Sequence, residues 1–316
     1  MSWPACAASR LRRTIAERDE KEDAMRRIEF FVNSWIFGEV PLEEVVRRVA
    51  NLGYDGIELV GEPKVYKAGE VSRLVEDHNL RVISICGMHP GPEEGDLRAL
   101  SHYDPQERQR AVDYVRACID LACGVGARSV LVVPSLVGVP QYFRSKEEDT
   151  KWAVDSLQKA GEHARECKVL LTIEPINRYE VGLVNSIEDA LDMARRVDNE
   201  WVRIMGDTFH MQIEEGDGIP NAIRRAGGYW LQHLHAADNT REAPGKGTIN
   251  WREVLRALHD VGYEGGVSLE PLPKGASPYD ARKGVIPREQ LDSGLKFGLE
   301  HLRREQEVVL QYVRRT

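Results

Sequence analysis

The sequence contains few cysteines, and their arrangement excludes a disulfide scaffold. Five cysteines occur in 316 residues, the number is odd, and none form a Cys-x-x-Cys pair. Cys86 and Cys118 lie inside apolar segments. Disulfide-rich secreted domains are short and carry paired cysteines, so this composition is typical of a reducing compartment, and we expect a cytoplasmic protein.

Long apolar runs and excess positive charge are also missing. No stretch approaches the roughly 20 continuous apolar residues of a membrane helix, and residues 1–25 lack the apolar segment of a signal peptide. Lys and Arg number 43 against 51 Asp and Glu, which gives a net charge of −8 with His neutral. Because nucleic acids and anionic membranes attract basic surfaces, we expect neither as a partner. Residues 1–25 are predicted to form an N-terminal extension, disordered or loosely helical.

The sequence does contain a regular alternation of short β-like runs with helical patterns. Candidate strands cover residues 27–33, 54–60, 80–86, 127–133, 168–174, 202–207, 229–235 and 264–270. The unit VANLGYDGIELVGEP returns later as LHDVGYEGGVSLEPLP, each with a helix end, a glycine and a strand. Each of the eight candidate strands is followed by a helical pattern, and eight βα units in about 280 residues predict a single-domain α/β fold, a (β/α)₈ TIM barrel over residues 26–316 with a C-terminal helix. A doubly wound open sheet is the alternative, but the first turn, FFVNSWIFGE, lacks its usual glycine fingerprint.

Four successive strands of this pattern end on residues with metal-ligand chemistry. These are Glu174, Asp207, His235 and Glu270, which lie 33, 28 and 35 residues apart. A barrel brings the carboxyl ends of its strands to one rim, so the four side chains should meet there. Gathering them in a buried site is costly unless a cation is present. Three carboxylates and one imidazole suit Mn²⁺, Mg²⁺ or Co²⁺ better than structural zinc, so we expect one divalent ion, with Mn²⁺ first.

Each of these residues alone has a simpler explanation. A glutamate at a strand end is commonly solvated, and a histidine on an apolar strand is commonly a hydrogen-bonded core residue. Recurrence in four consecutive units favours the metal site. For the same reason we interpret Glu58 and Glu62, at the end of the second strand, as residues that form hydrogen bonds at the rim of the barrel and not as metal ligands. Asn250 and Glu253 are interpreted as a helix N-cap and its reciprocal partner.

The motifs IEPINRYE, GDTFHMQIEE, HLHAADNTREAPGKGTINW and GYEGGVSLEP together resemble a known family. They resemble the ketose 3-epimerases of the D-tagatose/D-psicose (allulose) group, within the xylose-isomerase-like TIM-barrel superfamily of sugar isomerases and epimerases. The resemblance extends over about residues 26 to 305 and is strongest from 170 to 273. It implies the metal ligands Glu174, Asp207, His235 (rather than His233) and Glu270, and substrate contacts from Glu180, His210 and Arg241. It also implies a sugar substrate and a homo-oligomer, either a dimer or a tetramer.

The expected reaction is C3 epimerisation of a free ketose through a cis-enediolate, with Glu174 and Glu270 as acid and base. No clear basic phosphate pocket appears, although Lys274 in PLPKGASP could contribute one. An aldose–ketose isomerase or an inosose-type dehydratase could use the same metal site. An endonuclease-IV-like nuclease ranks lower, because it needs more histidine ligands and a basic groove.

Overall fold

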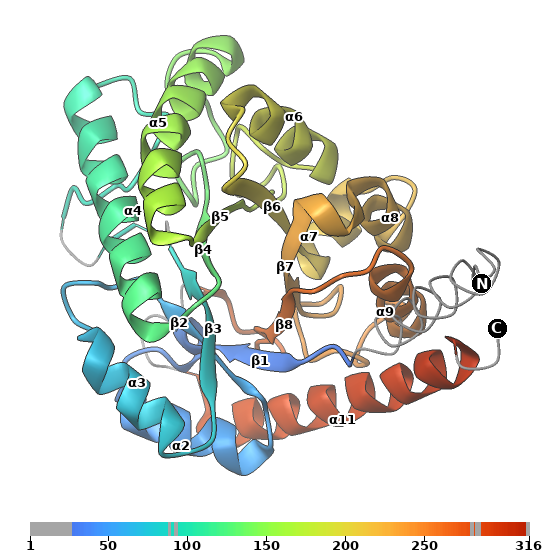
Figure 1. Cartoon of the computed structure of the whole chain (residues 1–316). Helices are drawn as coiled ribbons and strands as arrows, with labels where there is room; N and C mark the ends of the chain where they lie inside the picture. The colour runs from blue at the N-terminus through green and yellow to red at the C-terminus, as the bar shows by residue number, and fades with distance from the viewer. Residues whose placement is uncertain (1–26, 88–89, 92–93, 279–280, 282–285, 314–316) are drawn as a thin grey trace, which may run out of the picture.

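The computed structural model describes residues 27–87, 90–91, 94–278, 281 and 286–313, so the predicted extension over residues 1–25 lies outside the described part. Eight parallel strands close into a barrel in chain order, and the helices surround it (Figure 1). The strands are β1 (Phe30–Asn33), β2 (Gly56–Val60), β3 (Arg81–Cys86), β4 (Ser129–Val132), β5 (Leu170–Ile173), β6 (Val202–Asp207), β7 (Leu231–Ala236) and β8 (Gly266–Leu269). The predicted barrel is confirmed, and the alternative of an open sheet is wrong because β1 pairs with β8.

Helices follow the strands as the sequence pattern predicts. They are η1 (Ser34–Phe37), α2 (Leu42–Leu52), α3 (Ala68–Glu76), α4 (Pro105–Val125), α5 (Lys146–Cys167), α6 (Ile187–Val197), α7 (Thr208–Glu214), α8 (Ile219–Trp230), α9 (Trp251–Asp260) and α11 (Arg288–Val313). Figure 1 shows α11, the predicted C-terminal helix, along the outside of the barrel, where it contacts α2 and α9. It therefore closes the ring of helices between α9 and α2.

Local chemistry sets the helix ends. Gly53 ends α2 in a left-handed conformation with φ 84°, which costs glycine little because it has no Cβ. Asn250 caps α9 as expected, since its side chain accepts a hydrogen bond from the Glu253 amide. The predicted strand over residues 229–235 begins too early, because the chain kinks at Gly227 and then forms a further helical turn, so residues 229–230 belong to α8 instead of β7. Most of the other predicted strands also extend one to three residues beyond the observed ones.

The barrel interior is apolar near its base and polar toward its mouth. Gly266 faces Phe31, and a Cβ at that glycine would lie only 2.8 Å from the Phe31 ring, so glycine there leaves room for the aromatic side chain. Above this level the buried interior contains Glu58, Thr172 and His233. The polar groups lie at the end where active sites of this architecture occur.

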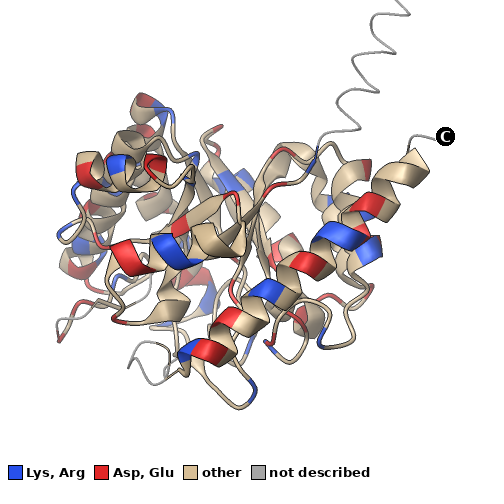
Figure 2. Cartoon of the chain, turned by 90° about the horizontal axis from the view of Figure 1, so that it is seen from below, with Lys and Arg blue, Asp and Glu red and all other residues tan. Residues whose placement is uncertain are grey.

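Acidic and basic residues alternate over the surface. In the view of Figure 2, red and blue residues are interspersed along α11 and the neighbouring helices, with no continuous basic stripe on this face. Among the described residues, no helix has both the length and the apolar character that crossing a bilayer requires.

Candidate active site

The four predicted ligand residues meet inside the barrel mouth. Glu174 and Glu270 directly follow β5 and β8, Asp207 is the last residue of β6, and His235 lies on β7. Side-chain atoms of Asp207, His235 and Glu270 lie within 4.8 Å of one another. Nδ1 of His235 is 3.5 Å from Glu174 Oε1 and 3.2 Å from Glu270 Oε2. The barrel thus brings together groups that are separated by up to a third of the chain.

Two atoms at the centre of this group are buried without a hydrogen-bond partner among the described residues. They are Oδ2 of Asp207 and Nδ1 of His235. Leaving such atoms unpaired is costly unless a ligand completes them. Both carry lone pairs suited to a divalent cation, and the adjoining carboxylates add oxygen ligands. The residues present therefore fit a divalent metal site.

The protonation equilibria of the site show the cost of crowding carboxyl groups away from water. Burial and, after it, the neighbouring Glu270 carboxylate raise the pKa of Asp207 to about 7, against the opposing effect of Arg241 and His235. Burial also raises the pKa of Glu174. Burial lowers the pKa of the His235 imidazole, but Glu58 and Glu270 outweigh that effect, and the pKa is held well above its ordinary value. Without a metal, protons supply the positive charge that the carboxylates require.

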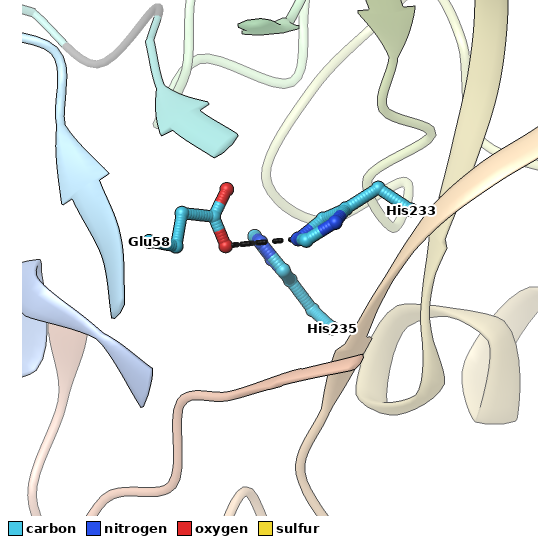
Figure 3. Close-up of side chains that lie close together, drawn as sticks. All are labelled: Glu58, His233 and His235. Atoms are coloured by element: carbon cyan, nitrogen blue, oxygen red, sulfur yellow. Dashed lines mark hydrogen bonds and ion pairs between the residues drawn. The ribbon is translucent and has the colours of Figure 1, made fainter. Parts of the chain in front are cut away.

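Glu58 lies inside the barrel, contrary to its interpretation as a rim residue. One oxygen, Oε2, lies 3.0 Å from Nε2 of His233 and 2.8 Å from Nε2 of His235. Figure 3 shows both rings pointing at this carboxylate. Burial opposes ionisation of Glu58, but the two histidines outweigh it and hold its pKa well below the ordinary value. An ionised carboxylate only accepts hydrogen bonds, so Nε2 of His235 donates, which leaves Nδ1 as the nitrogen that faces the mouth.

Glu62, the other glutamate of this strand end, makes the expected hydrogen bonds. Its two carboxylate oxygens accept from the Arg98 guanidinium at 3.0 and 2.9 Å. It is thus a rim hydrogen-bonding residue as predicted, whereas Glu58 belongs to the metal-ligand neighbourhood. The overlooked indication was the position of Glu58 in the middle of GIELV, between Ile57 and Leu59, where a charged side chain must point into the barrel.

Three donors hold the Glu270 carboxylate. Trp35 Nε1 donates to Oε2 at 2.8 Å, the Asn33 amide donates to the same atom at 3.3 Å, and Arg241 donates to Oε1 at 2.8 Å. The sequence interpretation missed Asn33 and Trp35, which come from the end of β1 and from η1. Arg241 has a left-handed backbone with φ 60°, a conformation that is costly for a non-glycine residue and is common at functional sites.

The predicted substrate contacts border the same cavity. It is lined by Trp35, Pro90, Val137, Glu174, Ile176, Glu180, His210, His235, Arg241, Glu270 and Pro278. His210 Nε2 lies 3.3 Å from Asp207 Oδ2. Asn177, also missed from the sequence, donates to Glu180 at 2.9 Å and lies 2.7 Å from His210 Nδ1. The amide therefore fixes both residues at one side of the cavity, and the Asp207 side chain beside His210 is fully buried.

The sequence matches the family model described as "Xylose isomerase-like TIM barrel" over residues 46–302. The chain belongs to this family. A D-psicose 3-epimerase from Ruminiclostridium cellulolyticum is 31% identical over 238 residues, which are 74% of this chain and 79% of that protein. A 3-dehydro-D-guloside 4-epimerase from Escherichia coli is 28% identical over 80% of this chain and 95% of its own length.

A solved structure supports the same relationship. The crystal structure of D-psicose 3-epimerase with D-tagatose from Clostridium cellulolyticum H10 superposes with a TM-score of 0.77 at 26% identity, and the match covers 88% of this chain and 99% of that chain. These comparisons confirm the expected family and the expected enzyme class, isomerase. The named relatives act on different carbons of their sugars, which leaves the reaction of this chain to be argued from its own site.

Proposed function

We propose that this protein is a metal-dependent epimerase that inverts C3 of a free ketose. The observation that carries the proposal is the convergence of Asp207, His235 and two glutamates in a sugar-epimerase fold, where Oδ2 of Asp207 and Nδ1 of His235 are buried and make no hydrogen bond to the described residues. A cation completes those atoms, and the glutamates on either side provide groups that exchange protons. Relatives that epimerise ketoses at C3 support the choice of reaction.

Glu174, Asp207, His235 and Glu270 would hold the ion. When bound, a divalent cation supplies a Lewis acid beside the substrate's carbonyl and hydroxyl oxygens. Mn²⁺ is the ion we propose first, with Mg²⁺ and Co²⁺ as alternatives, because the ligand set is rich in oxygen. Metal analysis of the purified protein, EDTA treatment and add-back of single ions test this choice.

Proton transfer falls to the two glutamates. Glu174 and Glu270 border the cavity from strands separated by β6 and β7. One removes the proton from C3 to give a cis-enediolate, and the other returns a proton to the opposite face. The raised pKa of the buried Glu174 suits a group that carries the proton. The donors on Glu270 keep its carboxylate in a fixed orientation, which suits a group that accepts the proton.

Glu180, His210 and Arg241 are proposed to hold the sugar. They face the cavity beside the glutamates, and Arg241 brings a guanidinium to within 2.8 Å of Glu270. A fixed cation at this point stabilises negative charge that develops on substrate oxygen. The Trp35 and Ile176 side chains provide apolar wall for the carbon skeleton.

The decisive experiment incubates the metal-loaded protein with a panel of ketoses, aldoses and 3-keto-glycosides in D₂O and follows each carbon by NMR. Deuterium at C3 of a ketose with inversion supports the proposal. Exchange at C4 of a 3-keto-glycoside assigns the reaction of the Escherichia coli relative instead. Exchange at C1 or C2 assigns an aldose–ketose isomerase, and loss of water a dehydratase. No exchange with any sugar overturns the proposal.

The predicted homo-oligomer remains part of the proposal. Mass photometry of the purified chain distinguishes a monomer from the proposed dimer or tetramer. A reducing cytoplasm remains the proposed location, on the cysteine usage alone.

A further inference from the structure

A second group of metal-ligand side chains lies on the outer helices, away from the barrel mouth. Asp120 and Cys123 are on α4, and His163 and Cys167 are on α5. These helices lie side by side and pack along their length (Figure 1). Residues three or four apart share one face of a helix. The two pairs therefore face one another across the α4–α5 contact.

Side-chain atoms of Asp120, His163 and Cys167 lie within 4.8 Å of one another, and Cys123 lies beside Cys167. His163 Nε2 lies 2.7 Å from Asp120 Oδ1. Cys167 Sγ lies 3.8 Å from that nitrogen and 3.9 Å from that oxygen. The Cys123 thiol is close enough to interact with the Cys167 thiol. One atom from each of Asp120, His163 and Cys167 is therefore close enough to the others for all three to bind a single ion.

These separations are close to those of a tetrahedral zinc site. Bonds of about 2.3 Å to sulfur and 2.0–2.1 Å to nitrogen or oxygen, at a tetrahedral angle, place ligand atoms about 3.5 Å apart. The two distances from Cys167 exceed this by a few tenths of an ångström. The contact between His163 and Asp120 is 2.7 Å and has to open further, to about 3.4 Å. Small side-chain rotations on exposed helix faces accomplish both.

The charges around the cluster also favour a cation. Glu166 Oε2 lies 3.7 Å from His163 Nδ1, on the side of the ring away from the thiols. A carboxylate behind a histidine is the usual outer partner of a metal-binding imidazole. Burial raises the pKa of the Cys167 thiol, and Cys123, Asp120 and Glu166 raise it further. Without a cation, the local negative charge keeps that thiol protonated.

We propose that Asp120, Cys123, His163 and Cys167 form a binding site for a borderline-soft divalent ion of the zinc type. Two thiolates and an imidazole select such an ion, whereas the oxygen-rich set at the barrel mouth selects a harder one. Binding releases the two thiol protons to solvent. Cys123 is exposed and Cys167 partly so, so the ion enters from solvent without any movement of the barrel. Once bound, it links α4 to α5.

Cobalt absorption tests this site independently of catalysis. Co²⁺ is added to the reduced full-length protein. Thiolate-to-cobalt charge-transfer absorption reports sulfur ligands, which the set at the barrel mouth does not contain. We expect one equivalent of such absorption, abolished when Zn²⁺ is added. Cys123→Ser and Cys167→Ser should each weaken binding at least about tenfold. The matched control Cys6→Ser, a cysteine outside the described residues, should leave it unchanged.

The carboxylate ligand is tested on the same helix. Asp120→Asn should weaken Co²⁺ binding, and Asp113→Asn, two turns earlier on α4, should not. Circular dichroism confirms that each variant is folded. Absence of the sulfur band in reduced wild-type protein overturns the proposal, as does a band that survives both serine substitutions. A Cys123–Cys167 disulfide found by mass spectrometry, in a protein that binds no Co²⁺ when reduced, also overturns it and assigns a redox pair.

Discussion

Replacing Glu58 by glutamine removes one charge from the interior of the barrel and changes almost nothing in shape. Glutamine can still place an oxygen where Oε2 accepts from His233 and His235. Its amide nitrogen would occupy the position of Oε1, which has no hydrogen-bond partner among the described residues. The variant therefore isolates the electrostatic role of the carboxylate from its packing.

The magnitude follows from the contact with His235. A carboxylate behind a metal-binding histidine raises the basicity of the ring and fixes its orientation, and loss of such a partner typically costs 10- to 100-fold in metal affinity. This corresponds to about 1.4–2.8 kcal/mol. Loss of Glu58 also weakens proton binding at His235, whose pKa Glu58 raises. That second effect favours the metal, so the full loss is expected at alkaline pH, where protons no longer compete.

Isothermal titration of metal-free protein with Mn²⁺, at neutral and alkaline pH, measures both effects. Glu62→Gln is the matched control, because Glu62 lies on the same strand end but bonds Arg98 instead of a histidine. We expect its Mn²⁺ affinity to stay within about twofold of wild type. If folded Glu58→Gln protein binds Mn²⁺ as tightly as wild type at alkaline pH, Glu58 does not orient His235 toward a metal.

Four further predictions address catalysis, pH and stability. Glu174→Gln and Glu270→Gln should each nearly abolish epimerisation, and one pairing of variant and epimer should still exchange the C3 proton with D₂O without inversion, as NMR would show. Near wild-type epimerisation by either metal-loaded variant would make that glutamate only a ligand. Arg241→Ala should lower kcat about 100-fold, as for loss of an oxyanion-stabilising group, with metal content unchanged by elemental analysis; unaltered kinetics would refute its role. Asp207 has a pKa of about 7 in the metal-free protein, so it is protonated below that pH and must ionise to bind metal. Mn²⁺ affinity should therefore fall as the pH drops through about 7, and a Mn²⁺ affinity that does not change with pH in calorimetric titrations would contradict this. Asp238 is buried and accepts bonds from the Trp251 indole and from three backbone amides, so Asp238→Ala should lower the free energy of unfolding by about 3–5 kcal/mol in urea; a change below about 1 kcal/mol would show that these bonds contribute little.

The repetition of one short pattern carried most of the fold prediction. A helical pattern and a buried strand alternate along the chain, in several units with a glycine between them, and the barrel strands are apolar because helices cover their outer faces. The strand-end residues Glu174, Asp207, His235 and Glu270 stood out against that background, since charged groups are rarely placed at the end of an apolar run without a reason. His233 and His235 are two residues apart on β7, so their side chains point to the same side of the sheet, and the two rings are 5.4 Å apart between centroids.

The sequence could not rank charged residues within a strand. Glu58 and Glu62 are both glutamates near the end of β2, and their sequence positions do not distinguish their roles. Glu58 contacts two histidines, whereas Glu62 contacts an arginine on the rim. The difference depends on strand register and on which strands face each other across the barrel. Glu58 meets His235 although 177 residues separate them.

The sequence by itself determined the repeated βα unit, the residue types at the strand ends and the motifs of the family, because each depends on neighbours only a few positions away. Tertiary structure alone decided which groups meet. Closure of the barrel brings Asn33 and Trp35 onto Glu270, and it buries one atom each of Asp207 and His235 without a hydrogen bond to the described residues. The packing of α4 on α5 joins two cysteines, a histidine and an aspartate that no local pattern connects. Long-range contacts of this kind follow from how the helices and strands pack, which adjacent residues do not encode.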